Sequence, residues 1–115
     1  MEGEWERLGG PLHQVAEGEK EGYFISLSDD GLTLLMGDPG SGGNNQGHAH
    51  IYKYNATSSQ WEQYGKNING SAAGDQFGYA VDLSKNGKRF AIGAPFSREL
   101  GTRESHGKVQ VYEIL

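Results

Sequence analysis

The chain has 115 residues, a formal net charge of -5, 19 glycines and no cysteine. The missing cysteines exclude disulfides and cysteine-ligated zinc, and the acidic balance counts against nucleic acid or an anionic membrane as a partner. No apolar run is long enough to span a bilayer, and the N-terminus lacks the basic start and apolar stretch of a signal peptide, so the sequence leaves localisation open.

One pattern occurs twice along the chain. A shift of 56 residues aligns Trp5 with Trp61, Gly22-Tyr23 with Gly78-Tyr79, Leu27-Ser28 with Leu83-Ser84, and Gly37 with Gly93. A loop that is four residues longer in the second copy then brings Gly47 and Tyr52 into line with Gly107 and Tyr112. Such a repeat is typical of architectures in which each unit stacks on neighbours to bury its core.

Period-two alternation predicts four strands in the first copy, over residues 23–27, 32–37, 48–54 and 60–65. The second copy repeats the first three over residues 79–83, 88–93 and 108–114, and it ends before a fourth. A segment resembling the missing fourth strand, with Trp5 in the place of Trp61, stands at the N-terminus. No helix is predicted anywhere.

Four antiparallel strands per copy favour an all-β fold of two propeller blades. We expect residues 1–9 to be an exchanged N-terminal strand, 10–65 the first blade and 66–115 a second blade without its own outer strand. Two blades cannot close a ring, so the N-terminal strand would complete the second blade of a neighbouring subunit. Three chains, giving six blades, are preferred over four, and an open filament is the other outcome. The residues expected at this contact are Trp5, Leu8, Val109 and Val111.

Phe77-Gly78 followed by Gly93-Ala94-Pro95 resembles the FG-GAP repeat of integrin-alpha-like β-propellers. The resemblance implies a non-catalytic module in a secreted or cell-surface protein. The first copy departs from the motif, with Glu21-Gly22 and Gly37-Asp38-Pro39 in place of Phe-Gly and Gly-Ala-Pro. The calcium-binding hairpin of the family is absent, so calcium is not carried over.

The sequence predicts no metal, no cofactor and no enzyme activity. His48 and His50 leave one face of a predicted strand, but no third ligand stands nearby, and Lys108 and Gln110 replace them in the second copy. Ordinary packing is the favoured interpretation for both histidines.

The long loops over residues 10–21, 38–47, 66–76 and 94–106 are expected on one face of the ring, where binding usually resides. The candidate ligand-binding residues of these loops are Asp38, Asn44, Asn45, Phe96, Arg98, Arg103 and His106. Two functions remain open. The first is self-assembly or protein binding, and the second is a small oligomeric lectin that binds glycans beside Phe96 and Arg98.

Overall fold

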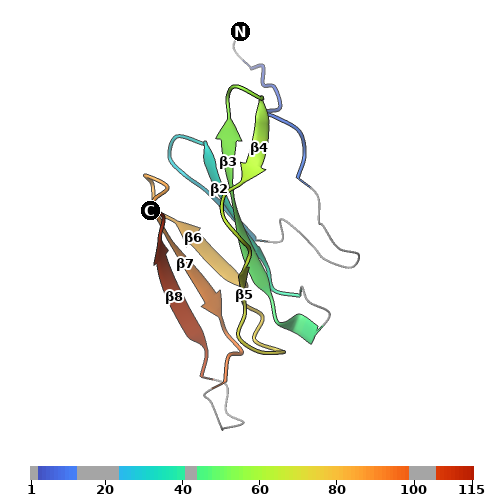
Figure 1. Ribbon diagram of the computed structural model, residues 1–115, viewed down its shortest axis with the longest axis vertical. Coiled ribbons are helices and arrows are strands. Elements are labelled where there is room, and N and C mark those ends of the chain that lie inside the picture. Colours follow the sequence, from blue (N-terminus) through green and yellow to red (C-terminus); the bar gives the residue numbers. More distant parts are fainter. Residues whose placement is uncertain (1–2, 13–23, 41–43, 99–105) are drawn as a thin grey trace.

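The computed structural model describes residues 3–12, 24–40, 44–98 and 106–115. Over these residues the chain is all-β with almost no helix, and it forms two antiparallel sheets that do not close into a barrel (Figure 1). The described part contains no helix that is long and apolar enough to cross a membrane. The shape is elongated, with principal extents of 57 × 30 × 27 Å.

The first sheet is a meander with the strand order β1-β2-β3-β4, and a fifth short strand, β5, pairs with the start of β3. Its strands are β1 (Phe24–Leu27), β2 (Thr33–Asp38), β3 (His48–Asn55), β4 (Gln60–Gln63) and β5 (Ile68–Asn69). The second sheet has the order β6-β7-β8. Its strands are β6 (Ala80–Leu83), β7 (Arg89–Ala94) and β8 (Lys108–Glu113).

The predicted all-β class and the seven strands predicted in the two copies are confirmed, with ends that differ by one or two residues, and β5 lies in a segment predicted to be a loop. β2 and β7 each run one residue further than predicted, through Asp38 and Ala94, and Tyr23 lies outside the described residues. The second sheet has three strands in the described chain, whereas residues 3–12 form no strand. Strand exchange and the propeller arrangement stay predictions.

The two sheets share one register. Leu34 pairs with Tyr52 in the first sheet as Phe90 pairs with Tyr112 in the second, and Asp38 pairs with His48 as Ala94 pairs with Lys108. The same holds for the first pair of strands, where Ile25 faces Met36 as Val81 faces Ile92. Each residue of the second sheet therefore has a positional equivalent in the first.

Because side chains alternate along a strand, each sheet has two faces that can be compared across the repeat. The Leu35 face of the first sheet carries Phe24, Ser26, Leu35, Gly37, Ala49 and Ile51. Its equivalent, the Ala91 face of the second sheet, carries Ala80, Asp82, Ala91, Gly93, Val109 and Val111. The opposite sides are the Leu34 face, which includes Ile25, Leu27, Met36 and Tyr52, and the Phe90 face, which includes Val81, Leu83, Ile92 and Tyr112.

The core lies between the Leu35 face of the first sheet and the Phe90 face of the second. Figure 1 shows β6 as the strand of the second sheet nearest to the first, and it contacts β1 and β2. Buried members of this core are Leu35, Ala49, Ile51, Phe77, Leu83, Phe90, Ile92 and Ala94. Burial of these apolar side chains joins two sheets that each have too little core alone.

Backbone contacts fix the two sheets closely against each other. A Cβ at Gly37 would lie 2.2 Å from the carbonyl oxygen of Gly78, so only glycine permits this approach. The backbone N–H of Leu83 donates to Ser26 Oγ at 3.0 Å, and that of Asp29 donates to the carbonyl of Lys85 at 2.8 Å. The interface between the sheets is therefore specific in position as well as apolar.

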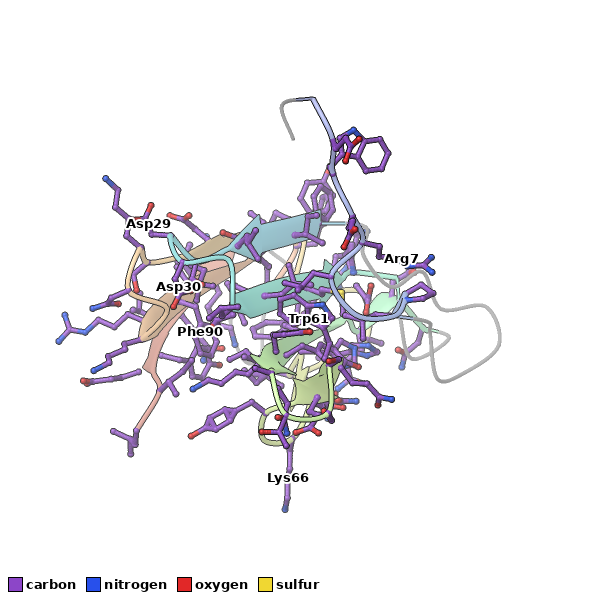
Figure 2. All side chains as sticks on the ribbon, turned by 90° about the horizontal axis from the view of Figure 1, so that it is seen from above. Arg7, Asp29, Asp30, Trp61, Lys66 and Phe90 are labelled. Carbon is purple, nitrogen blue, oxygen red and sulfur yellow. The ribbon has the colours of Figure 1, made fainter. Side chains whose placement is uncertain are left out.

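The N-terminal segment lies beside the outer strand of the first sheet. The indole Nε1–H of Trp61 donates to the carbonyl of Leu8 at 2.9 Å, and the Trp61 ring meets Tyr54 edge-on with centroids 5.5 Å apart. Figure 2 shows Trp61 next to the segment that carries Arg7. Trp5, by contrast, is 90% exposed.

Candidate functional site

The most concentrated polar chemistry of the described residues is a buried cluster of Asp38, His48 and His50. The last residue of β2 and the first and third residues of β3 supply it, so all three side chains leave the Leu34 face at one end of the sheet. Asp38 and His50 are each 1% exposed and His48 is 6% exposed. Charged and polar groups buried to this degree are usually paired or bound to a metal.

Both imidazoles converge on one carboxylate oxygen. His48 Nε2 lies 3.1 Å from Asp38 Oδ2, and His50 Nε2 lies 3.2 Å from the same atom. The two rings meet edge-on, with centroids 4.3 Å apart and an interplanar angle of 86°. The other oxygen, Asp38 Oδ1, is buried and has no hydrogen-bond partner among the described residues.

The electrostatics of the cluster favour an ionised aspartate. Burial acts to raise the pKa of Asp38, but hydrogen bonds and positive charge from His48 and then His50 outweigh it, so the pKa lies below its ordinary value. The cluster therefore presents a carboxylate and two imidazoles to one buried point. These are ligand types that suit divalent transition metals.

The prediction that Asp38 lies in a loop is wrong. Asp38 belongs to β2 and is buried, because the pairing of β2 with β3 continues one residue past Gly37 and sets Asp38 opposite His48. This pairing also supplies the third potential ligand that sequence reasoning missed. The signal available was the repeat itself: position 38 precedes Pro39 as Ala94 precedes Pro95, directly after the end of a predicted strand.

The second sheet lacks the cluster at the equivalent positions. Ala94 stands in the place of Asp38, Lys108 in that of His48 and Gln110 in that of His50. Lys108 donates from Nζ to Ser71 Oγ at 3.0 Å. The chemistry of the cluster is therefore confined to one of the two repeated units.

The predicted loop residues of the first copy have mainly backbone roles in the structure. Asn44 and Asn45 are exposed, and their carbonyls accept hydrogen bonds from the backbone of Gly74 and Gln76. Asn44 Oδ1 also accepts from the backbone N–H of Gln46. These contacts tie the loop of the first sheet to the segment that leads into the second.

In the second copy, Arg98 and His106 line one shallow hollow together with Ser97, Gly107 and Lys108. Phe96, which is exposed, is not among the residues that line it. Arg103 lies outside the described residues. The glycan-binding interpretation of this loop face stays a prediction.

The four predicted assembly residues are all exposed in the single chain. These are Trp5 and Leu8 in the N-terminal segment, with Val109 at 71% and Val111 at 69% on the Ala91 face. Their equivalents Ala49 and Ile51 are buried in the first sheet, because the Leu35 face is covered by the second sheet. The Ala91 face has no such cover within the described chain.

The chain matches no protein-family model, no curated protein and no solved structure. The resemblance to FG-GAP repeats therefore remains a prediction from sequence.

Proposed function

We propose that the chain is a non-catalytic repeat module of the β-propeller type whose function is self-assembly. The observation that carries this proposal is that exposed apolar side chains remain on one face of each sheet. They lie on the Ala91 face and along β1 on the Leu34 face, whose Met36 and Tyr52 are buried. On the Leu34 face of the first sheet Ile25 is 61% and Leu27 56% exposed, while Val109 and Val111 are still more exposed on the Ala91 face of the second.

These partly exposed faces are the equivalents of the two faces that already pack on each other within the chain. The Leu35 face packs on the Phe90 face. The Ala91 face is the repeat equivalent of the Leu35 face, and the Leu34 face is the repeat equivalent of the Phe90 face. A second copy can therefore continue the stacking by placing its Leu34 face on the Ala91 face of the first. Exposed apolar patches of this kind mark interaction sites.

Residues equivalent to those in two contacts between the sheets also suit a contact between two copies of the chain. Gly93 stands where Gly37 closely approaches Gly78, and a Cβ at Gly93 would meet only Ala80 at 3.4 Å or beyond. The position is therefore left clear for the backbone of a neighbour. Asp82 stands where Ser26 accepts a hydrogen bond from Leu83, so its carboxylate is placed to accept from a neighbour's Leu27.

The open edge of β8 gives the N-terminal segment a place in the same assembly. In the first sheet β4 pairs with β3 so that Trp61 faces Tyr54 and Glu62 faces Lys53. Transferred by the repeat, this register sets Trp5 of a neighbour opposite Ile114, and Glu6 opposite Glu113. An unpaired strand edge is a template for such pairing.

The contact is heterologous, because it joins two different surfaces. It closes into a ring if the rotation between copies fits. Three chains would give six blades and four would give eight, both within the range of known propellers, and we favour three. A rotation that does not fit gives an open filament.

The test is the mass in solution of the wild-type chain and of two variants, each blocked on one face. Val111→Asp places a charge on the Ala91 face, and Leu27→Asp places one on the Leu34 face. Both positions are exposed in the single chain, so each variant should keep its fold. We expect wild type to assemble, each variant alone to be monomeric, and their equimolar mixture to form a species of two chains through the one intact pair of faces.

Phe96→Asp is the matched control, because this exposed aromatic lies in a loop outside both faces, and we expect it to assemble as wild type does. A wild-type chain that is folded and monomeric at all concentrations would overturn the proposal. A mixture that stays monomeric while wild type assembles would show that assembly uses other surfaces.

A further inference from the structure

We propose that Asp38, His48 and His50 form a binding site for one divalent transition-metal ion of the zinc type, confined to the first of the two repeated units. The proposal rests on the buried cluster and is independent of the assembly surfaces. It would hold for a monomeric chain as well.

The spacing of the donor atoms fits such an ion. Zinc binds imidazole nitrogen and carboxylate oxygen at about 2.0–2.2 Å in tetrahedral geometry, which sets neighbouring donors about 3.3 Å apart. The two nitrogen-to-oxygen separations are 3.1 and 3.2 Å, and the donor atoms of the group all lie within 4.8 Å of one another. Small side-chain rotations would therefore complete three of four positions.

The carboxylate supplies a second, independent reason. Asp38 Oδ1 is buried without a hydrogen-bond partner among the described residues, although a buried carboxylate oxygen is costly to leave unsatisfied. A cation between Asp38 and the imidazoles would neutralise the buried charge, and carboxylate rotation could bring either oxygen to it. Each imidazole would then bind through Nε2 with its proton on Nδ1.

The donor set selects the class of ion. Two imidazoles disfavour calcium and magnesium, which take oxygen ligands, and the absence of thiolate disfavours copper(I). Three protein donors is the number found in zinc sites whose fourth position is taken by water. The binding order expected for first-row ions places copper(II) above both zinc and cobalt(II).

A metal ion at the site would link the end of β2 to the start of β3. Asp38 is the last residue of β2, and the histidines begin β3 after the glycine-rich loop over residues 39–47. Binding at this point joins the two strands at their last backbone pair, Asp38 and His48. Because an ion that binds only the folded chain stabilises it, metal should raise the unfolding temperature.

The test is a titration of the full-length chain, first freed of metal by a chelator, with Zn²⁺ in competition with a chromophoric chelator and with Co²⁺ followed by its visible absorption. We expect one equivalent per chain, a Co²⁺ spectrum typical of four-coordinate nitrogen and oxygen ligation, and a higher unfolding temperature with Zn²⁺. Asp38→Asn and His50→Gln should each weaken binding at least about 100-fold, which exceeds the loss usual for residues that only support a ligand.

Two further variants serve as controls for metal binding. His106→Gln removes an exposed histidine outside the cluster and should leave affinity unchanged. The triple variant Asp38→Ala, His48→Lys, His50→Gln installs the residues that the second sheet carries at these positions, and it should bind no metal. Wild type that binds no stoichiometric Zn²⁺ or Co²⁺, or a folded triple variant that binds as tightly as wild type, would overturn the proposal.

Discussion

The two sheets have the same register, yet side chains at equivalent positions differ in burial. Leu35, Ala49 and Ile51 are buried on one face of the first sheet. Of their equivalents in the second sheet, Val109 and Val111 are exposed and Ala91 is half-buried. The strand pattern alone therefore does not decide which face is core. The neighbouring sheet decides it, and within the described part of the chain the second sheet has a neighbour on one side only.

The largest effect should come from the glycine at the contact between the sheets. We expect Gly37→Ala to cost more than about 3 kcal/mol in the free energy of unfolding, because the added methyl would overlap the carbonyl oxygen of Gly78. Gly93→Ala is the equivalent change on the open face and should leave the stability of the single chain within about 0.5 kcal/mol. Urea unfolding monitored by circular dichroism, at a concentration where both variants are monomeric, measures the difference. Equal losses would mean that the two positions are not in different environments.

A second pair of changes probes the apolar contact. Ile51→Ala should cost about 3 kcal/mol because it empties a buried site in the core, whereas Val111→Ala should cost less than about 0.5 kcal/mol in the single chain. Val111→Ala should instead weaken assembly. Unfolding curves at low concentration and sedimentation at high concentration separate the two effects. A large loss of monomer stability in Val111→Ala would contradict the open face.

Removal of residues 1–10 tests the missing fourth strand. The deletion should leave the three strands of the second sheet folded and weaken assembly at least about 10-fold, because the edge of β8 then has no strand to pair with. The mass distribution by light scattering over a dilution series reports the change. Since the deletion also removes the hydrogen bond from Trp61 to Leu8, the control is Trp61→Phe, which loses that bond but keeps an aromatic ring beside Tyr54 and should assemble normally. A deletion variant that assembles as wild type does would show that no strand is exchanged.

The smallest expected effect concerns one cross-strand pair. Lys53 faces Glu62 in the first sheet, whereas the transferred register sets Glu6 opposite Glu113. Like charges at such a pair repel, so Glu6→Lys should strengthen assembly by about 0.2–1 kcal/mol at low salt. The gain should fall as salt is raised, because the pair is exposed. Glu4→Lys, with the same change in net charge, should give a smaller gain.

The strands and their order could be predicted from the sequence because alternation and the repeat agree along the chain. The burial of Asp38 could not, because the sequence does not say that the ladder continues one residue past Gly37 before the loop. The sequence also does not show which apolar side chains are exposed. Ile25 and Leu27 are as apolar as their equivalents Val81 and Leu83, and the two pairs differ only in what packs against them. The sequence indicated two members of the cluster, His48 and His50, because they share one face of a predicted strand. Asp38 could be added only once the pairing register of β2 and β3 was known.

The connection from β4 to β6 has a consequence for any closed assembly of this chain. Every chain carries two sheets, so a ring would contain an even number of blades and two kinds of seam in alternation. One kind is bridged by the peptide chain, and the other is held by contact alone. Dilution would therefore open a ring only at every second seam, and the smallest piece released would always be a pair of sheets with the Asp38, His48 and His50 cluster intact.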